Sequence, residues 1–455
     1  MKKAVNKEMG DRVLIAGLGK SGVGAMRLAL SQDIKVFACE KKRASEWEKC
    51  GETIPPQVKV EFESNGFELL DEVTDVIVSP GISYKSDFVK RAINKKKNVM
   101  SEIEFASRYT TVPIIAVTGT NGKTTVTKLI NEILRKDGKE SIEAGNIGTS
   151  LSEVVSQNFK GDYIVCEISS FQLELISNLK PHISLLLNIT PDHLDRYDSL
   201  DEYADTKMRI FENLSDEDFG IINADDSLIM TKLSKLRGQT FFFSRTQSKI
   251  KGAYVDSGEI VFRDLKFAEN IMPIERIKMK GCHNLENALS AVSVSMIVDV
   301  KKEVVAEVLE KFLPPSHRME EVANINNVLF INDSKATNID ALKRALEGIE
   351  EKVILIAGGR DKNGDFASIT DEVKSSVRLI IAIGEAAGKI EKAFSDIVEV
   401  FRAKTLEEAV NKAYRIARPG EVVLLSPGCA SFDMFDSYEH RGDEFKRCVR
   451  KLYEN

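Results

Sequence analysis

The chain contains short, uninterrupted runs of apolar residues that end at glycines, and these runs predict buried parallel strands. Three of them cover 12–16, 112–117 and 353–357, and a Gly-rich stretch follows each one. A short apolar run bounded by turn signals is typical of a strand that is buried on both faces, as in the parallel sheet of an α/β protein. Further strands are predicted at 34–38, 75–79, 163–166, 183–188, 220–223, 378–383 and 421–425.

Other stretches indicate helices and a small antiparallel insertion. The amphipathic pattern predicts helices at 301–312 and 341–349. Apolar and polar residues alternate over 253–263, downstream of three phenylalanines at 241–243, so we expect an antiparallel insertion around 240–280. This mixture of strands and helices predicts the α/β class.

The spacing of these elements divides the chain into three α/β units, at 1–110, 111–314 and 315–455. The second boundary lies near two consecutive prolines, which interrupt any helix. The total of 455 residues agrees with three units, since a domain has about 100–200 residues.

Composition narrows the functional classes. Apolar residues make up 43% of the chain and charged residues 29%, which is the balance of a folded protein. The net charge of −6 argues against a basic surface for nucleic acid, but it is compatible with a local basic site for phosphates. No apolar run approaches the ~20 residues of a membrane helix. The charged N-terminus lacks the apolar core of a signal peptide, and the six cysteines form no Cys-x-x-Cys pair, so we expect a cytoplasmic protein with reduced thiols.

The first candidate site is the sequence Gly-x-Gly-x-x-Gly at 17–22, directly after the strand at 12–16. Its glycines would let backbone N–H groups approach a phosphate at a helix N-terminus. Glu40 stands 18 residues beyond Gly22, where an acid that binds a ribose would follow the next strand. Three interpretations are open at this point: a nicotinamide cofactor, another nucleotide diphosphate, and a purely structural turn. A second loop around Gly81 is expected at the same sheet edge.

A stronger candidate is Thr-Gly-Thr-Asn-Gly-Lys-Thr-Thr at 118–125, between an apolar strand and a predicted helix. Successive backbone N–H groups in such a loop form a cradle for anions, and the positive end of the helix adds to it. Lys123 would reach the β- and γ-phosphates of a nucleotide, and the Thr124 hydroxyl would bind Mg²⁺. The general motif has a glycine where this chain has Val117, and here a glycine stands at Gly119 instead.

Two further clusters are expected at the same edge of this sheet. Glu167 ends the strand around 163–166 and stands 44 residues after Lys123, in the place of a second Mg²⁺ ligand. The sequence Asn-Ile-Thr-Pro-Asp-His at 188–193 follows another predicted strand. His193 would bind a metal or a phosphate, although a lone histidine is more often structural.

Asn284 and Asn287 open a predicted helix three residues apart, hence on one helical face. Paired carboxamides can bind both the acceptor N7 and the donor N6 of adenine, and capping of the helix by Asn284 is the alternative. Polar clusters also follow strands of the last unit, at 332–338, 358–362 and 426–442. Their convergence on strand C-termini is the expected arrangement of a ligand site in an open α/β domain.

Taken in order, these motifs resemble the Mur ligase superfamily, the ATP-dependent amide-forming enzymes of peptidoglycan synthesis. The resemblance rests on 118–125, Glu167, His193, 283–287, 332–338 and 426–442. The last two stretches resemble the members that add D-glutamate. The resemblance covers nearly the whole chain, with weak motifs only in 1–110. It implies a Rossmann-like N-terminal domain, a central P-loop ATPase-like domain with a mainly parallel sheet, and a Rossmann-like C-terminal domain.

The resemblance also implies which residues bind the substrates. The glycine turn would bind UDP rather than a nicotinamide, with a UDP-sugar site at Gly19, Ser21, Glu40, Lys41, Gly81 and Asn146. The implied ATP site consists of Gly119, Thr120, Asn121, Gly122, Lys123, Thr124, Thr125, Asn284, Asn287, Arg318, Asp333 and Lys335. The implied D-glutamate site consists of Thr337, Lys362, Ser431, Phe432 and Tyr438, the last at a position where Phe also occurs.

The implied catalytic residues are Lys123, His193 and Lys207. Mg²⁺ at two sites is implied as well, with Thr124, Glu167, His193 and Lys207 as ligands. Lys207 matches a family lysine that is carbamylated by CO₂. A carbamate converts a cation into an anion, which suits a site that must hold Mg²⁺.

The implied reaction joins D-glutamate to UDP-N-acetylmuramoyl-L-alanine through an acyl phosphate and releases ADP and phosphate. The implied enzyme is a cytoplasmic monomer without nucleic-acid partner or membrane segment. An NAD-dependent oxidoreductase is a rival, but it leaves the loop 118–125 unexplained. A ligase for another substrate, such as a folylpolyglutamate synthase, is opposed by 426–442. A non-catalytic nucleotide-binding protein is opposed by the joint presence of Lys123, Glu167, His193 and Lys207.

Overall fold

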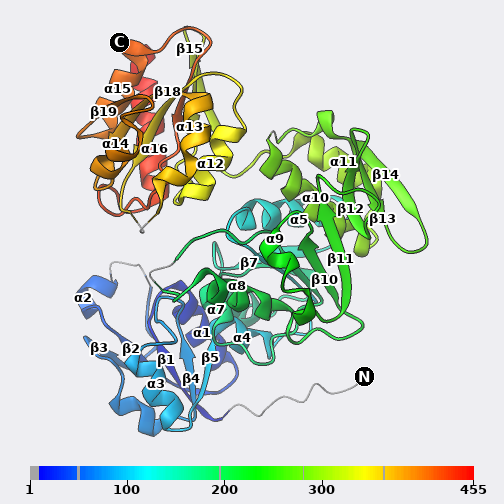
Figure 1. Ribbon diagram of the computed structural model, residues 1–455. Coiled ribbons are helices and arrows are strands. Elements are labelled where there is room, and N and C mark those ends of the chain that lie inside the picture. The colour runs from blue at the N-terminus through cyan, green and yellow to red at the C-terminus, as the bar shows by residue number, and fades with distance from the viewer. Residues whose placement is uncertain (1–9, 49–51, 194–195, 280, 362–363, 455) are drawn as a thin grey trace. The chain divides into compact units, whose positions relative to one another are not determined.

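The computed structural model describes residues 10–48, 52–193, 196–279, 281–361 and 364–454 (Figure 1). These residues form three sheets with helices, and the chain divides into two compact units. The first unit consists of Met1–Ile189, Asp201–Pro273 and Ala288–Val308, and the second of Thr190–Leu200, Ile274–Asn287 and Leu309–Asn455. Each unit therefore contains segments that are far apart in the sequence.

Five parallel strands form the first sheet of the first unit, in the order β3-β2-β1-β4-β5. Their bounds are β1 Arg12–Ala16, β2 Lys35–Glu40, β3 Lys59–Phe62, β4 Asp75–Val78 and β5 Asn98–Ser101. The helices of this part are α1 Lys20–Ser31, α2 Ala44–Trp47, α3 Asp87–Asn94 and α4 Glu102–Ser107, with a 3-10 turn at Glu68–Glu72. Because the order of strands reverses at β1, the turns after β1 and β4 lie at a switch point, where open α/β sheets bind ligands.

The second sheet of the first unit has the order β14-β13-β12-β11-β10-β9-β6-β8-β7. The bounds are β6 Ile114–Thr118, β7 Ser141–Gly145, β8 Tyr163–Glu167, β9 Ile183–Leu186, β10 Phe219–Asn223, β11 Gln239–Ser244, β12 Gly252–Asp256, β13 Glu259–Arg263 and β14 Ala268–Pro273. Strands β6 to β12 pair in parallel, whereas β13 and β14 pair antiparallel, which confirms the predicted insertion. Strand β6 lies between β8 and β9, so three strand ends meet at one edge.

Several helices follow these strands along the chain. They are α5 Lys123–Lys136, α6 Leu151–Ser156, α7 Ser170–Leu173, α8 Leu200–Met208, α9 Ser227–Met230, α10 Cys282–Ile297 and α11 Lys302–Lys311. Short 3-10 turns cover Arg209–Phe211, Leu233–Lys235 and Ile274–Arg276. In α5 the buried residues recur at helical spacing, including Val126, Leu129, Ile130 and Ile133. The helix α11 confirms the helix predicted at 301–312.

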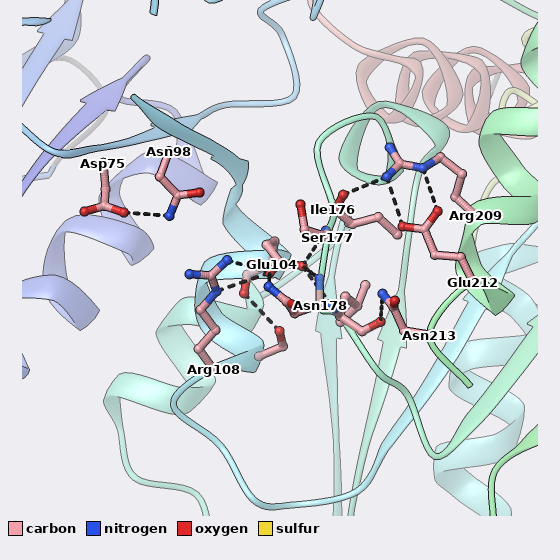
Figure 2. Close-up of polar contacts among 12 residues, drawn as sticks. Asp75, Asn98, Glu104, Arg108, Ile176, Ser177, Asn178, Arg209, Glu212 and Asn213 are labelled. Carbon is pink, nitrogen blue, oxygen red and sulfur yellow. Dashed lines mark hydrogen bonds and ion pairs between the residues drawn. The ribbon is translucent and has the colours of Figure 1, made fainter. Parts of the chain in front are cut away.

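Buried polar contacts join the two sheets of the first unit through α4 (Figure 2). The Glu104 side chain is fully buried, and its Oε2 accepts hydrogen bonds from the backbone N–H groups of Ser177, Asn178 and Leu179 at 3.0, 2.9 and 2.8 Å. Its Oε1 pairs with Arg108 at 2.8 Å. The carboxylate of Glu104 on α4, which follows the first sheet, thus accepts hydrogen bonds from three consecutive backbone amides in the segment between β8 and β9 of the second sheet.

The carbonyl side of the same connection is held by Arg209 (Figure 2). Its guanidinium donates to the carbonyl oxygens of Leu173, Glu174 and Ile176 at 2.8, 2.7 and 2.7 Å. Arg209 opens the 3-10 turn that follows α8. Residues 173–179 are therefore held from two sides, because the Glu104 carboxylate binds their amides and the Arg209 guanidinium binds their carbonyl oxygens.

The second unit contains a six-stranded sheet in the order β15-β16-β20-β17-β18-β19. The bounds are β15 Glu320–Ile325, β16 Val328–Asn332, β17 Val353–Gly358, β18 Val377–Ile383, β19 Glu399–Arg402 and β20 Val422–Leu425. Strand β15 pairs antiparallel with β16, and the other pairs are parallel. One apolar core packs on α12 Ile339–Glu347, α13 Thr370–Ser376 and α14 Ala387–Phe394, with a 3-10 turn at Phe366–Ile369. A second core packs on α15 Leu406–Ile416 and α16 Tyr438–Glu454.

The structure confirms the predicted α/β class with mainly parallel sheets, and every predicted strand overlaps a strand of the structure. The three sheets span 12–101, 114–273 and 320–425. The domain limits 1–110, 111–314 and 315–455 stay a prediction. Within the described residues, no helix combines the length and the apolar character that crossing a membrane requires.

Candidate functional site

The loop between β6 and α5 has the backbone of a phosphate-binding loop. Gly119 and Gly122 have φ angles of +152° and +87°, which glycine adopts without strain. A Cβ on Gly119 would lie 2.9 Å from the Cβ of Leu187, so a side chain does not fit there. The Nζ of Lys123 donates to the carbonyl oxygens of Gly119 and Thr120 at 2.9 Å each. The ammonium group therefore lies against the loop, where a bound phosphate would meet it.

The end of β8 brings a carboxylate to the start of α5. The Thr124 hydroxyl donates to Oε2 of Glu167 at 2.8 Å. The other carboxylate oxygen accepts a hydrogen bond of 3.1 Å from the side-chain amide of Asn146. The backbone N–H of Asn146 donates to the backbone carbonyl oxygen of Glu167 at 2.9 Å. The predicted metal ligands Thr124 and Glu167 are thus in contact, and hydroxyl and carboxylate oxygens are ligands that Mg²⁺ prefers. Asn146, predicted for the UDP-sugar, lies beside them.

The end of β9 supports the other side of the phosphate loop. Asn188 Oδ1 accepts from the backbone N–H of Asn121 at 2.8 Å, and the Asn188 carbonyl accepts from the N–H of Thr120 at 2.9 Å. The hydroxyl groups of Thr120 and Tyr203 are 3.2 Å apart. Thr125 is buried on α5. Sequence reasoning did not assign a role to Asn188 or Tyr203. The position of 188–193 after a predicted strand pointed toward Asn188, and no signal pointed toward Tyr203.

Lys207 reaches the same loop from α8. Its side chain is 1% exposed, and its Nζ donates to the carbonyl oxygen of Gly119 at 2.8 Å. The ammonium also lies 4.7 Å from the ring centre of Tyr203. The structure therefore brings Lys207 and Lys123 to one carbonyl oxygen, although 84 positions separate them in the sequence. Carbamylation of Lys207 stays a prediction.

The glycine turn of the first sheet contacts two neighbouring strand ends. Oε2 of Glu40 accepts from the backbone N–H of Leu18 at 2.8 Å, so the carboxylate lies on the turn. The Ser79 hydroxyl donates to the carbonyl oxygen of Gly17 at 2.7 Å and joins the turn to the loop after β4. The other residues predicted for the UDP-sugar here are exposed or half-buried: Gly19, Ser21, Lys41 and Gly81. UDP-sugar binding by these residues stays a prediction.

The pair of asparagines predicted for adenine lies inside the first turns of α10. Nδ2 of Asn287 donates to Oδ1 of Asn284 at 3.3 Å, and both side chains are buried. Because α10 begins at Cys282, Asn284 is not the residue that caps the helix, and the alternative of capping is wrong. Burial lowers the pKa of the adjacent His283 to about 4, and the charge of Arg318 contributes in the same direction. Arg318 therefore lies near this helix start, within the second unit.

The turn after β16 carries two residues predicted for ATP. Burial raises the pKa of Asp333 to about 7 although the Ser426 hydroxyl donates to it at 2.9 Å. The Nζ of Lys335 lies 3.5 Å from the ring centre of Tyr438, so a residue predicted for ATP contacts one predicted for D-glutamate. The structure thus brings the two predicted sites of this unit together.

Residues predicted for different ligands also share a cavity of about 470 Å³ in the second unit. Thr337 and His193 both line it. The adjacent residues are joined as well, because Nδ2 of Asn338 donates to Oδ2 of Asp192 at 3.0 Å. Metal binding by His193 and D-glutamate binding by Thr337 stay predictions.

The remaining residues predicted for D-glutamate follow β20 and β17. Ser431 is buried, whereas 64% of the Phe432 side chain is exposed. Lys362 lies outside the described residues. Among the described residues, no group of three or more His, Cys, Asp or Glu side chains could hold a metal. A metal in this chain would therefore also need ligands such as the Thr124 hydroxyl.

Three models of one family together match most of the chain. The Mur ligase MurD-like N-terminal domain matches residues 11–101, the Mur ligase middle domain 117–295, and the Mur ligase glutamate ligase domain 317–429. The chain belongs to the Mur ligase family. A family of ligases does not support the nicotinamide interpretation of the glycine turn.

Curated relatives of this Mur ligase align with it over nearly the whole of both sequences. The UDP-N-acetylmuramoylalanine–D-glutamate ligase of Thermoanaerobacter pseudethanolicus is 42% identical over 449 residues, which cover 97% of this chain and 99% of that protein. The enzyme of the same name from Koribacter versatilis is 40% identical and covers 98% of both chains.

Solved structures confirm the fold of this Mur ligase. The pseudomurein peptide ligase type C from Methanothermus fervidus has a TM-score of 0.63 at 19% identity and covers 97% of this chain and 100% of its own. The MurF ligase from Thermotoga maritima in complex with ADP has a TM-score of 0.60 at 15% identity and covers 97% and 95%.

Proposed function

We propose that this Mur ligase joins D-glutamate to UDP-N-acetylmuramoyl-L-alanine and converts ATP to ADP and phosphate in the process. The observation that best supports this function is the phosphate-binding loop, in which the Thr124 hydroxyl contacts the Glu167 carboxylate at 2.8 Å. This geometry suits ATP chemistry, and relatives of about 40% identity carry the name of this D-glutamate ligase. ATP and a nucleotide sugar are cytoplasmic metabolites, so we place the reaction in the cytoplasm.

The first step activates a carboxylate. An oxygen of the alanyl carboxylate attacks the γ-phosphorus of ATP in line, the bond from that phosphorus to the β–γ bridging oxygen breaks, and ADP leaves with the electron pair. Lys123 offsets negative charge on the phosphate oxygens, since this chemistry depends mostly on positioning and electrostatics. Mg²⁺ held by Thr124, Glu167 and carbamylated Lys207 would supply further positive charge there, and His193 stays a predicted ligand.

The second step forms the amide. The neutral amine of D-glutamate attacks the acyl carbon of the acyl phosphate, the bond from carbon to the phosphate oxygen breaks, and the nitrogen loses a proton. Thr337, Ser431, Phe432, Tyr438 and Lys362 are the residues that we assign to the amino acid. Because water also hydrolyses an acyl phosphate, these residues must exclude it while the amine attacks.

The test is ADP production by the purified chain with ATP, Mg²⁺ and UDP-N-acetylmuramoyl-L-alanine, across a panel of D- and L-amino acids. We expect ADP release only when D-glutamate is present. Strong activity with L-lysine or L-glutamate, and none with D-glutamate, would overturn the proposed substrate. ADP release that needs no UDP-sugar would overturn the proposed acceptor.

A further inference from the structure

Arg441 is a fully buried cation in the second unit, below the ends of three neighbouring strands. It lies on α16, and 1% of the residue is exposed. Sequence reasoning placed it in the stretch 426–442 without assigning it a role. A guanidinium group is rarely buried to this extent unless an anion balances it.

The guanidinium group of Arg441 is fully occupied by neutral acceptors. Its Nε donates to the Ser334 hydroxyl at 2.9 Å, and Nη2 donates to the Ser334 carbonyl oxygen at 2.8 Å. Nη1 and Nη2 both donate to the Cys429 carbonyl oxygen at 3.2 Å, and Nη1 also to that of Ala430 at 3.4 Å. These hydrogen bonds satisfy the donors, but none of the acceptors carries a negative charge.

Within the described part of the chain, no carboxylate forms an ion pair with Arg441. The charges of Asp333 and Asp433 act on it from farther away. Asp333 balances it only in part at neutral pH, because burial raises the pKa of that carboxyl to about 7. Burial lowers the pKa of Arg441 to about 10, so the guanidinium remains charged at neutral pH.

The position of this charge points to a ligand. Ser334 follows β16 and Ala430 follows β20, and a Cβ on Gly359, after β17, would lie 3.2 Å from Nη1 of Arg441. These strands are adjacent in the sheet, so the charge lies at the carboxyl ends of parallel strands. Three residues predicted to bind substrates are direct chain neighbours of its partners, namely Asp333, Lys335 and Ser431.

We propose that Arg441 is a positioning residue whose buried charge makes the amino-acid site selective for an anionic amino acid. The inference rests on the proposed function and adds to it the source of the preference for an acidic side chain. The attacking amine must be neutral, so an amino acid with two carboxylates carries two negative charges when it reacts. A fixed cation in a poorly solvated site stabilises that form, whereas a hydrated surface lysine would be screened. Arg441 acts through this field and need not touch the substrate.

The test compares Arg441→Gln, which removes the charge, with Arg441→Lys, which keeps it and gives up part of the hydrogen bonding. For each folded variant, KM is measured separately for D-glutamate, ATP and UDP-N-acetylmuramoyl-L-alanine. We expect Arg441→Gln to raise KM for D-glutamate at least about tenfold, the scale of one lost charge interaction in a partly solvated site. KM for the other two substrates should change less than about threefold, and Arg441→Lys should stay within about threefold of the wild type throughout.

Two further variants separate charge from packing. Ser334→Ala removes one acceptor of Arg441 and the hydrogen bond of 2.8 Å from the Ser334 hydroxyl to the Tyr438 carbonyl oxygen, but it leaves the charge, so KM for D-glutamate should stay within about threefold. Ser334→Asp places a carboxylate against the guanidinium without creating a cavity, and it should raise KM for D-glutamate as Arg441→Gln does. Arg450→Gln, which removes an exposed arginine from the same helix, is the matched control and should change nothing.

The proposal is overturned if Arg441→Lys and Arg441→Gln raise KM for D-glutamate equally, or if the rise falls on ATP instead. It is also overturned if Ser334→Ala acts as strongly as Ser334→Asp. If Arg441→Gln does not fold, the lysine and Ser334 variants still decide the matter. A wild-type chain without D-glutamate-dependent ADP release would reject the proposed function. An active wild type with unaffected variants would reject only the role of Arg441.

Discussion

The Thr124 hydroxyl donates a hydrogen bond of 2.8 Å to Oε2 of Glu167. Thr124 lies at the second position of α5, and Glu167 is the last residue of β8, the strand next to β6. A hydroxyl and a carboxylate that approach from two neighbouring strand ends provide oxygen ligands beside a phosphate loop.

Glu167→Gln should lower the rate of ADP formation by at least about a hundredfold, because the amide keeps the shape of the side chain but loses the charge with which we propose that Glu167 binds Mg²⁺. Titration of Mg²⁺ in the steady-state assay should also show a higher half-saturating concentration. The matched control is Glu143→Gln on β7, where the carboxylate accepts from the Asn131 side chain at 3.1 Å. Equal activity of the two variants would contradict a metal-binding role of Glu167.

Lys123→Ala should abolish ADP release that depends on both acceptor and amino acid, because the clamp on the phosphates contributes several kcal/mol to the transition state. The ammonium group lies 2.9 Å from two carbonyl oxygens of the loop, so truncation removes a cation from the loop itself. Lys136→Ala at the other end of α5 breaks only an exposed ion pair with Glu307 and serves as the control. Near-normal turnover of Lys123→Ala would reject the assignment of this loop to ATP.

Lys207→Ala should lose most activity and regain part of it when short carboxylic acids are added. An added carboxylate can occupy the space of the missing side chain and supply the anion that a carbamate would provide. The Nζ of Lys207 is held at 2.8 Å from the Gly119 carbonyl, so this space opens directly on the phosphate loop. Lys207→Arg fills the space with a permanent cation and should not respond to the acids. Stimulation of the arginine variant, or none of the alanine variant, would count against carbamylation.

Glu104→Gln should reduce the free energy of unfolding by about 2–4 kcal/mol, because it removes the charge that binds three amides and Arg108 in a buried place. Burial alone would raise the pKa of Glu104, but the amide hydrogen bonds and Arg108 outweigh it and lower the pKa from its usual value. The stabilisation is therefore complete above the unfolded pKa of about 4.3 and is lost as pH falls through the lower folded pKa.

Urea unfolding of the wild type and Glu104→Gln at neutral pH and below pH 4 measures this difference. The gap between the two proteins should shrink at the lower pH, because the wild-type carboxylate becomes protonated. Glu72→Gln removes an exposed partner of Lys59 and should shift the free energy by less than about 1 kcal/mol. A gap that is constant or widens on acidification would contradict the assigned pKa direction.

Much of the fold could be predicted because its strands are apolar runs that end at turn residues. Strand β6 shows the limit of this reasoning, since the predicted strand begins at 112 and the observed one at Ile114. Pro113 lacks the N–H group that a central strand donates, so it pairs through its carbonyl oxygen alone, which accepts from the N–H of Ile164 at 3.0 Å. The antiparallel insertion was also predictable, because alternation is a local signal.

The candidate site was predictable where chemistry follows a strand end and unpredictable where it depends on distant contacts. The loop 118–125 is recognisable from its own sequence motif, and Glu167 from its position at the end of an apolar run. Lys207 came from the resemblance alone, because no local pattern shows that a lysine of α8 reaches Gly119. Tyr203 was missed for the same reason, since its partner stands on the phosphate loop far away in the sequence. Asn188 opens the stretch 188–193 that was expected at this edge, but its contact with Asn121 was not predicted.

The chain passes between the two units after residues 189, 200, 273, 287 and 308. The second unit is therefore not one continuous stretch of the sequence. Two short segments from the middle of the chain, which carry His193 and Asn284, belong to it. A protein that consists of 315–455 alone would lack both of these segments and part of the cavity that His193 lines. A transfer of this whole unit to a relative would therefore require three separate pieces of the chain, 190–200, 274–287 and 309–455.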